Sequence, residues 1–532
     1  MVSSISLAER RFSIPVVVRY SLLGLLVLLL GVRLSFLGTG ALAFPDEERY
    51  YRSVEAVEAL VGGDVAGFCE RLSQTQGRPG DALWRVAPAS LQVLLAEVAG
   101  VSPHSPASLL IPVAFNYLIV LCSLLVYYRI GRQLLRNEPA ALLSTLVYGC
   151  LVNTNLYIRH ILPYDAALLC FFLTVHWVLR LRQRPERRTY WAVFSIGALS
   201  ALTFAIYPGY NAAVVVGWVM LLEKRAIWPF NWRRLLSTSV VFALGAAGVL
   251  LLFELLTQAG GSSYLESCIS LSSTITQGDF ADGFSFLFKY LFEAERSLGY
   301  LLVGLAAASV PVLLYRLARR RCPTVAAYAE LIRDNMLLLS MVLAFLAYAV
   351  MVFYQEKLVF YGRILHLYLP FFVLLLAKVL YPATRRLQFV PVALVAGTAL
   401  YSFGVFAVEY HRIVYPLTVL YQQVPGLKST TVAHKSQTGT ADNADYYLAR
   451  APLLETPTTD TSRQAVLVNV AFLYPIHAGV WCNIVELPPS YKLLFSAPHF
   501  LTLPAYPFEG YRTEERDVIS HCKYQCQVYV QQ

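Results

Sequence analysis

Residues 107–129, ASLLIPVAFNYLIVLCSLLVYYR, decide the fold class, because they carry no charged side chain before Arg129. A helix rises about 1.5 Å per residue, so about 20 apolar residues cross the hydrocarbon of a bilayer. The stretch therefore predicts a membrane-spanning helix. Comparable apolar runs lie at 16–37, 139–157, 164–181, 190–206, 209–222, 236–257, 297–317, 336–354, 362–381 and 388–408. Together they predict an α-helical polytopic membrane protein with about eleven transmembrane helices.

The composition also indicates lipid as the main solvent. The 532 residues are 57% hydrophobic and 14% charged, whereas soluble domains carry about 25% charged residues. The net charge of +10 comes from short basic clusters between apolar runs, which is the distribution that orients membrane helices. No continuous basic face is available to follow a phosphate backbone. We therefore expect membrane lipids, and no nucleic acid, among the partners.

The basic clusters assign a side to each loop. Arg10 and Arg11 precede the first span, and placing them in the cytoplasm makes every alternate loop cytoplasmic. Each of those loops is basic. They lie at 129–136, 180–188, 224–234, 316–321 and 385–386. The pattern predicts a multi-pass protein of the plasma (inner) membrane with a cytoplasmic N-terminus. Residues 41–43, ALA, resemble a signal-peptidase site, but the long apolar run before them favours a retained anchor.

Two loops on the predicted outer side are long. Loop 38–106 contains two amphipathic stretches, one with Tyr50, Val54, Val57 and Val61 at helical spacing and one with Leu91, Leu94, Leu95 and Val98. Neither stretch is long enough to span, so we expect both to lie in the plane of the interface. Loop 258–295 is polar. A transmembrane domain is thus expected over residues 1–408.

The tail, residues 409–532, alternates turn-rich polar stretches with a β-like run at 465–473. We expect a small extracytoplasmic α/β domain there. An oxidising compartment permits disulfides in a small domain, so Cys482 could pair with Cys522 or Cys526. Pairing between Cys522 and Cys526 is the alternative.

The segment 44–50, FPDEERY, directly follows the first span. In one interpretation it starts a helix, with Asp46 as the cap and the acidic side chains at the positive end of the helix dipole. In the other, a carboxylate at the membrane boundary takes a proton from an incoming hydroxyl.

The short outer turn 159–165, RHILPYD, offers a second carboxylate, Asp165. Asp165 stands where a helix begins, so capping is again one interpretation. The other is that the two acidic turns converge on one face of the membrane.

Cations gather at the outer end of the tenth span: Lys357, Arg363 and His366. They either anchor the helix at the headgroups by snorkelling or clamp a phosphate group, which suits a planar guanidinium. Glu254, near the outer end of the seventh span, is a weaker candidate. His176, within the fourth span, is expected to be a hydrogen-bonded packing residue.

These motifs resemble the C-type glycosyltransferases (GT-C superfamily), which include protein O-mannosyltransferases and lipid A aminoarabinose transferases. The acidic pair in a Pro-Asp-Glu-x-Arg-Tyr context is similar to the first outer loop of that superfamily, and 84–98 to its second interfacial helix. The turn 159–165 resembles the family's arginine–proline–aspartate turn, and 361–370 its late helix with a basic residue facing the lipid phosphate. The similarity covers roughly residues 10–400. The tail matches no family motif.

The resemblance implies an inverting glycosyltransferase with a polyprenyl-phosphate sugar as donor and a lipid, glycan or protein acceptor on the outer side. It implies a catalytic base at Asp46, supported by Glu47. Asp165 would be a second active-site acid and the ligand of a divalent metal. Substrate-binding roles would fall to Arg159, Tyr164, Lys357, Arg363 and His366, with Lys357 or Arg363 neutralising the leaving phosphate.

Two other functions compete with this one. A polyprenyl-linked glycan flippase or transporter predicts ionisable residues near mid-membrane and broken helices in internal repeats. A non-catalytic membrane scaffold predicts that the tail alone binds a partner and that the loop carboxylates are dispensable.

Overall fold

A computed structural model gives the fold of the chain. It describes residues 16–37, 48–73, 79–104, 106–158, 161–184, 189–222, 231–277, 285–319, 325–355, 362–384, 389–410, 432–435, 465–469, 491–496 and 526–531. Within these residues, five helices are long and apolar enough to cross a membrane. They cover Ala107–Leu135, Tyr164–Gln183, Trp232–Ala259, Gly362–Leu380 and Val390–Val408. The chain is a helical membrane protein, as the sequence predicts, whereas the number of eleven spans stays a prediction.

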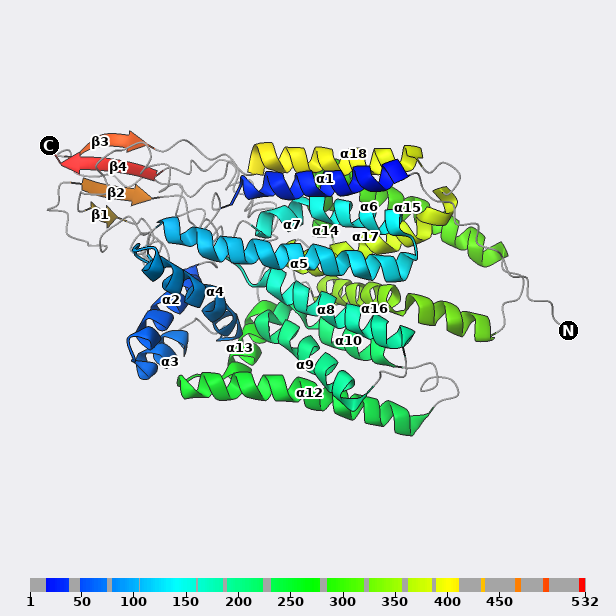
Figure 1. The fold of residues 1–532 in the computed structure, drawn as a ribbon, viewed down its shortest axis with the longest axis horizontal. Coiled ribbons are helices and arrows are strands. Elements are labelled where there is room, and N and C mark those ends of the chain that lie inside the picture. The colour runs from blue at the N-terminus through cyan, green and yellow to red at the C-terminus, as the bar shows by residue number, and fades with distance from the viewer. Residues whose placement is uncertain are drawn as a thin grey trace.

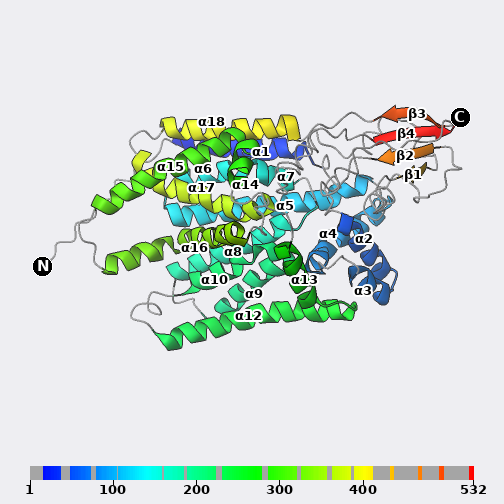
Figure 2. The same ribbon diagram turned by 180° about the vertical axis from the view of Figure 1, so that it is seen from behind.

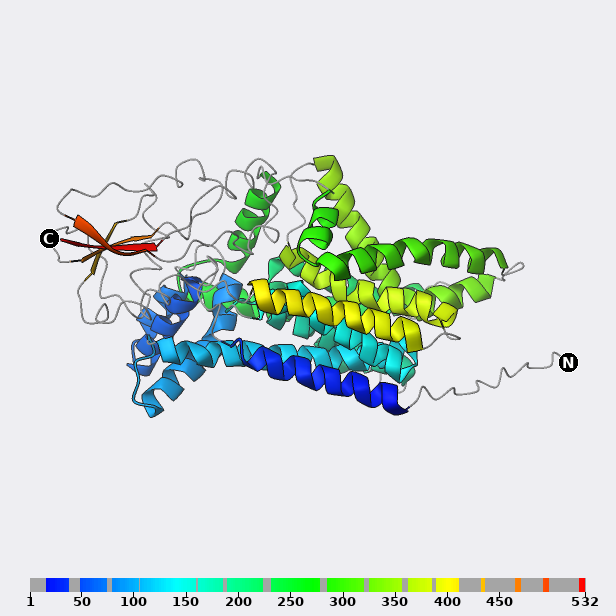
Figure 3. The ribbon, with the colours of Figure 1, turned by 90° about the horizontal axis from the view of Figure 1, so that it is seen from above.

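The long helices pack lengthwise into one bundle (Figure 1). They are α1 (Val16–Leu34), α5 (Leu110–Leu135), α6 (Glu138–Cys150), α8 (Tyr164–Gln183), α9 (Tyr190–Ile206), α10 (Ala212–Leu221), α12 (Trp232–Ala259), α15 (Arg296–Arg319), α16 (Val325–Gln355), α17 (Gly362–Thr384) and α18 (Phe389–Val405). Two views place α1 beside α18 (Figures 1 and 3). There the rings of Phe36 and Phe406 meet edge to face at 6.4 Å. The shared core is apolar, with aromatic rings of α5, α6, α8 and α17 in contact at its centre.

The span expected at 139–157 is broken in the structure. Asn137 starts α6 by accepting a hydrogen bond from the Ala140 N–H, but α6 ends at Cys150 because Leu151 leaves the helical region (φ −53°, ψ 132°). A short helix, α7 (Val152–Tyr157), follows. The break frees backbone groups inside the bundle, and these need partners because lipid offers none.

Loop 38–106, which is predicted to lie on the outer side, contains the two predicted amphipathic stretches in α2 (Glu48–Val61) and α4 (Pro79–Val98), with α3 (Val65–Ser73) between them. These three are called the outer helices. Tyr50, Val54 and Val57 of α2 are buried. The predicted apolar stripe of α4 is exposed, since its four members are 41–86% exposed, while Val93 and Ala96 pack inward. The short helix η2 (Pro106–Leu109) then leads into α5.

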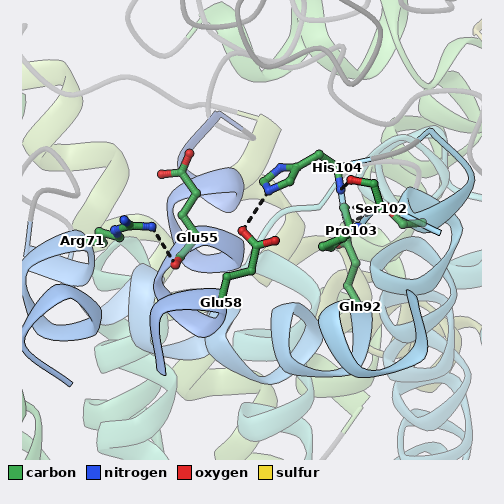
Figure 4. A network of polar contacts seen from close by, with 8 residues as sticks. Glu55, Glu58, Arg71, Gln92, Ser102, Pro103 and His104 are labelled. Carbon is green, nitrogen blue, oxygen red and sulfur yellow. Dashed lines mark hydrogen bonds and ion pairs between the residues drawn. The ribbon is translucent and has the colours of Figure 1, made fainter. Parts of the chain in front are cut away.

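Polar contacts hold these outer helices together (Figure 4). Buried Gln92 of α4 accepts a hydrogen bond from the Tyr50 hydroxyl at 2.6 Å and donates to the Pro103 carbonyl at 2.7 Å. His104 meets Glu58 at 2.9 Å, although both side chains are about one-third exposed. Arg71 of α3 donates to the backbone carbonyl of Glu55. The outer helices therefore form a compact unit against α5 and α9.

The tail contributes a four-stranded sheet of β1 (Val432–Lys435), β2 (Ala465–Asn469), β3 (Tyr491–Ser496) and β4 (Cys526–Gln531). Its strand order is β1-β2-β4-β3, with β1 and β2 parallel and the other two pairs antiparallel. β2 falls in the β-like run predicted at 465–473. The sheet lies at the same end of the bundle as α2, α3 and α4 (Figures 1 and 2). Cys482 and Cys522 lie outside the described residues, so the predicted disulfide stays a prediction.

The remaining helices, α13 (Tyr264–Gln277) and α14 (Ser285–Glu293), come from the predicted outer loop 258–295. α13 follows α12 and extends toward α4, whereas α14 leads back into the bundle through the turn before α15 (Figures 1 and 2). This turn, residues 294 and 295, reaches the break between α6 and α7 and so enters the candidate site.

Candidate functional site

Asp165 lies in the first turn of α8, with its side chain 2% exposed. The helix cap is Pro163, which makes no side-chain capping bond. Asp165 Oδ1 instead lies 3.0 Å from His366 Nε2 of α17. Oδ2 is buried and has no hydrogen-bond partner among the residues that the structure describes. Asp165 therefore does not act as a helix cap, and it presents one unused oxygen.

His366 is 1% exposed, and both of its ring nitrogens are engaged. Nδ1 lies 2.5 Å from Asn153 Oδ1 of α7, and Nε2 faces Asp165. Asn153 Nδ2 donates to the Gly362 carbonyl at 2.8 Å and to the Tyr290 hydroxyl at 2.6 Å. The sequence predicts a substrate-binding role for His366. The structure places it in a buried bond with the predicted acid Asp165.

Arg363, one turn before His366, joins the site through Tyr164. Its guanidinium donates to the Tyr164 hydroxyl at 3.1 Å and lies 6.0 Å from the centre of that ring. The Tyr210 hydroxyl donates to the Arg363 backbone carbonyl at 3.1 Å. Tyr164 also meets the rings of Tyr157 and Tyr207 at 5.1 and 4.7 Å. The rings of Tyr157, Tyr164 and Tyr207 thus form a cluster, and the Arg363 guanidinium is bound to the Tyr164 hydroxyl of this cluster.

The structure brings together four of the predicted site residues, Tyr164, Asp165, Arg363 and His366, from the starts of α8 and α17. The sequence alone does not show that these two helix starts meet. The other four predicted residues lie outside the described part of the chain: Asp46, Glu47, Arg159 and Lys357.

The break between α6 and α7 is stabilised by Arg33, which sequence analysis did not single out. Arg33 is 3% exposed near the end of α1. Its guanidinium donates to the Gly149 carbonyl and, through Nε at 2.7 Å, to Asn155 Oδ1. Asn155 Nδ2 in turn donates to the carbonyls of Gly149 and Leu151. These bonds satisfy the Gly149 carbonyl at the end of α6, whereas the Leu151 carbonyl also accepts the backbone N–H of Asn155.

Glu295, also not singled out by the sequence analysis, supplies the opposite charge. It lies in the turn between α14 and α15, outside the helices, and is fully buried. Its carboxylate accepts from the backbone N–H groups of Val152 at 2.8 Å and Asn153 at 2.9 Å. Burial raises the pKa of Glu295 to about 7, while the two backbone hydrogen bonds lower it in part. Glu295 therefore caps the start of α7 from across the bundle.

The signals for these residues and their partners in the sequence were polar letters within or beside apolar runs: Arg33 within 16–37, VNTN at 152–155 and the Glu-Arg pair at 295–296. A hydropathy profile alone does not show which groups such residues contact in the fold.

The two weaker candidates, Glu254 and His176, lie on α12 and α8. Glu254 Oε2 accepts from the Leu265 N–H at 2.9 Å and Oε1 from Gln258 at 2.7 Å, so Glu254 stabilises the start of α13. His176 is buried as expected. The hydrogen bond expected of it is missing, since neither ring nitrogen finds a partner within the described part of the chain.

A divalent metal was predicted at Asp165. The described residues do not fit a metal site by themselves, because no group of three or more His, Cys, Asp or Glu side chains gathers among them. Both nitrogens of His366 are used, which leaves Asp165 Oδ2 as a single ligand atom. The metal therefore stays a prediction that would need ligands from residues such as Asp46.

Comparisons with known proteins give one type of match. No protein family and no curated protein matches the chain. Among solved structures, the fold is similar to the Archaeoglobus fulgidus oligosaccharyltransferase in complex with Zn and sulfate, with a TM-score of 0.39 and 12% sequence identity. The match covers 74% of this chain and 60% of that one.

Proposed function

We propose that the chain is a membrane glycosyltransferase. It would move a sugar from a polyprenyl-phosphate donor to a lipid, glycan or protein acceptor at the outer face of the membrane. The observations that support this most are the buried carboxylate of Asp165, which has one unused oxygen, and the guanidinium of Arg363, which donates to the hydroxyl of the preceding residue, Tyr164. A sugar phosphate would present its hydroxyls to Asp165 and its negative charge to Arg363.

The proposed reaction is a direct displacement. The acceptor hydroxyl oxygen attacks the anomeric carbon and forms the new glycosidic bond, while the bond from that carbon to the phosphate oxygen breaks. The electron pair leaves with the phosphate, whose growing charge a guanidinium or ammonium group stabilises. The hydroxyl proton passes to a general base. We assign the base to Asp46 with the support of Glu47, and the charge stabilisation to Arg363 or Lys357.

The site location suits a lipid donor. A polyprenyl chain remains in the bilayer, so its phosphate lies at headgroup depth. The site residues stand at the starts of α8 and α17, at the end of the bundle that also holds the outer helices and the sheet (Figure 2). The proposed function makes that end extracytoplasmic, as the positive-inside rule predicts.

A polyprenyl-linked glycan flippase is a second candidate, because the break between α6 and α7 and the buried Arg33 and Glu295 are features that transporters also use. Mass spectrometry of lipid extracts from cells that lack the protein separates the two. A transferase predicts a glycan or lipid that is one sugar shorter, and a flippase predicts accumulation of the complete precursor on the inner side. An unchanged set of glycans and lipids would contradict both.

A further inference from the structure

Asn153, His366 and Asp165 form a row of hydrogen bonds across three helices. They belong to α7, α17 and α8, and each side chain is at most 2% exposed. The contacts along the row are 2.5 Å from Asn153 to His366 and 3.0 Å from His366 to Asp165. Their positions in the sequence, 153, 366 and 165, give no sign of this arrangement.

The Gly362 carbonyl fixes the donor and the acceptor of the hydrogen bond between Asn153 and His366. The Gly362 carbonyl can only accept, so the Asn153 amide points its NH₂ there and its oxygen at His366. His366 Nδ1 must then donate to Asn153 Oδ1. The carboxylate of Asp165 can only accept unless it is protonated, so one proton lies between His366 Nε2 and Asp165 Oδ1. No ring nitrogen of His366 is left for a phosphate.

Glu295 fixes the far end of the row. Its carboxylate holds the backbone N–H groups of Val152 and Asn153, which sets the position of Asn153 from outside α7. The Glu295 carbonyl also accepts a bond from Ser402 of α18 at 3.3 Å. The turn at 294–295, α7, α17 and α18 therefore all contribute to the orientation of the Asp165 carboxylate.

The near end of the row is left unsatisfied. Asp165 Oδ2 is buried without a partner among the described residues, and leaving such a group unpaired costs free energy. Arg33, which interacts electrostatically with Asp165, also has one guanidinium nitrogen, Nη1, without a partner there. An oriented carboxylate with one free oxygen is suited to receive a hydrogen bond from a ligand.

We propose that Glu295, Asn153 and His366 are positioning residues for Asp165. They hold Oδ1 so that Oδ2 accepts a hydrogen bond from a hydroxyl of the donor sugar. This inference rests on the proposed function, since it places Asp165 at the bound sugar. In this proposal His366 orients Asp165 and does not contact the phosphate, whereas the sequence suggests a phosphate contact for it.

Kinetics of the full-length protein in liposomes test the role. His366→Leu should lower kcat/KM for the polyprenyl-phosphate sugar by about 10²-fold, the cost of a misplaced catalytic group. It should leave the Kd for sugar-free polyprenyl phosphate unchanged. His366→Gln, whose amide can still donate to Asp165, should recover part of the loss. His176→Leu is the matched control and should leave transfer unchanged. A raised Kd for the sugar-free lipid, or equal losses for the Leu and Gln variants, would overturn the proposal.

Nitrogen NMR on histidine-labelled protein tests the row without any activity. The His366 signals are those that disappear in His366→Gln. We expect Asn153→Leu to move the Nδ1 resonance and Asp165→Asn to move the Nε2 resonance. If both move but the wild-type protein transfers no sugar, the proposed function fails while the row stands. If the protein transfers sugar but neither resonance moves, the positioning proposal fails.

Discussion

Replacing Glu295 by Gln perturbs the turn that caps α7. The two carboxylate oxygens of Glu295 accept from the N–H groups of Val152 and Asn153 at 2.8 and 2.9 Å. Gln keeps the size of the side chain but has one acceptor oxygen, and its NH₂ group faces the second N–H. One buried backbone donor loses its partner, which costs about 1–3 kcal/mol in the free energy of unfolding. This magnitude applies at low pH, where Glu295 is protonated and the lone pairs of its two oxygens can still accept both N–H bonds, and it shrinks as Glu295 ionises.

The difference between wild type and Glu295→Gln should depend on pH. Burial raises the pKa of Glu295 to about 7 from an ordinary value of 4.5. Between these values the folded protein keeps a proton that the unfolded chain has released, so rising pH favours unfolding. The wild-type free energy of unfolding, relative to the variant, therefore falls through this window. The difference between the two pKa values, 4.5 and about 7, corresponds to about 3 kcal/mol in the free energy of unfolding.

The assay is reversible unfolding in detergent micelles at several pH values. Glu97→Gln is the control, because Glu97 is an exposed carboxylate on α4 and should follow wild type at every pH. Parallel curves for wild type and Glu295→Gln from about pH 4.5 to about pH 7 would refute the account of Glu295 as a buried cap.

Three further predictions concern the packing, the donor site and the topology. Gly245→Ala should destabilise the protein by about 1–3 kcal/mol in the same assay, because the added Cβ would lie 2.0 Å from the Phe194 carbonyl oxygen of α9. Gly248→Ala is its control, since that Cβ would lie at an ordinary 3.9 Å from the Phe194 ring; equal stabilities would contradict the close packing of α9 and α12. Arg363→Ala should weaken binding of polyprenyl phosphate to folded protein through loss of a charge-assisted partner, and unchanged affinity would favour a headgroup anchor. A reporter that is active only in the cytoplasm should be silent when fused after residue 430, and strong activity would refute the orientation.

The sequence predicts well what hydropathy and periodicity measure. The apolar run 107–129 lies within the span that includes α5, the two amphipathic stretches lie in α2 and α4, and β2 falls in the predicted β-like run. The choice of Asp165 as an informative residue also came from its position in a polar turn. These features depend on neighbours in the chain, so a single sequence contains them.

The break after Cys150 was missed because 139–157 is apolar enough to pass as one helix. A new helix can begin at Val152 and Asn153 because Glu295, 142 positions away from Asn153, accepts their backbone N–H groups. Periodicity also shows that α4 has an apolar face, but not that this face stays exposed while Val93 and Ala96 pack inward.

The role of His366 shows the same limit. Its position near Arg363 suggested a cationic cluster for a phosphate, and only the bonds to Asn153 and Asp165 show that both ring nitrogens are used. A partner 201 positions away in the chain leaves no periodic pattern.

Sugar transfer by purified protein tests the central claim most directly. Wild-type protein in liposomes would receive a labelled polyprenyl-phosphate sugar at saturating concentration and a mixed lipid and glycan acceptor fraction. The proposed mechanism predicts transfer by wild type and a turnover lower by about 10²–10⁴-fold in Asp46→Asn, the loss typical of a missing general base. It predicts a marked loss in Asp165→Asn as well, with donor-lipid binding retained in both variants. Absence of transfer by wild type, or near-normal turnover in both variants, would contradict it.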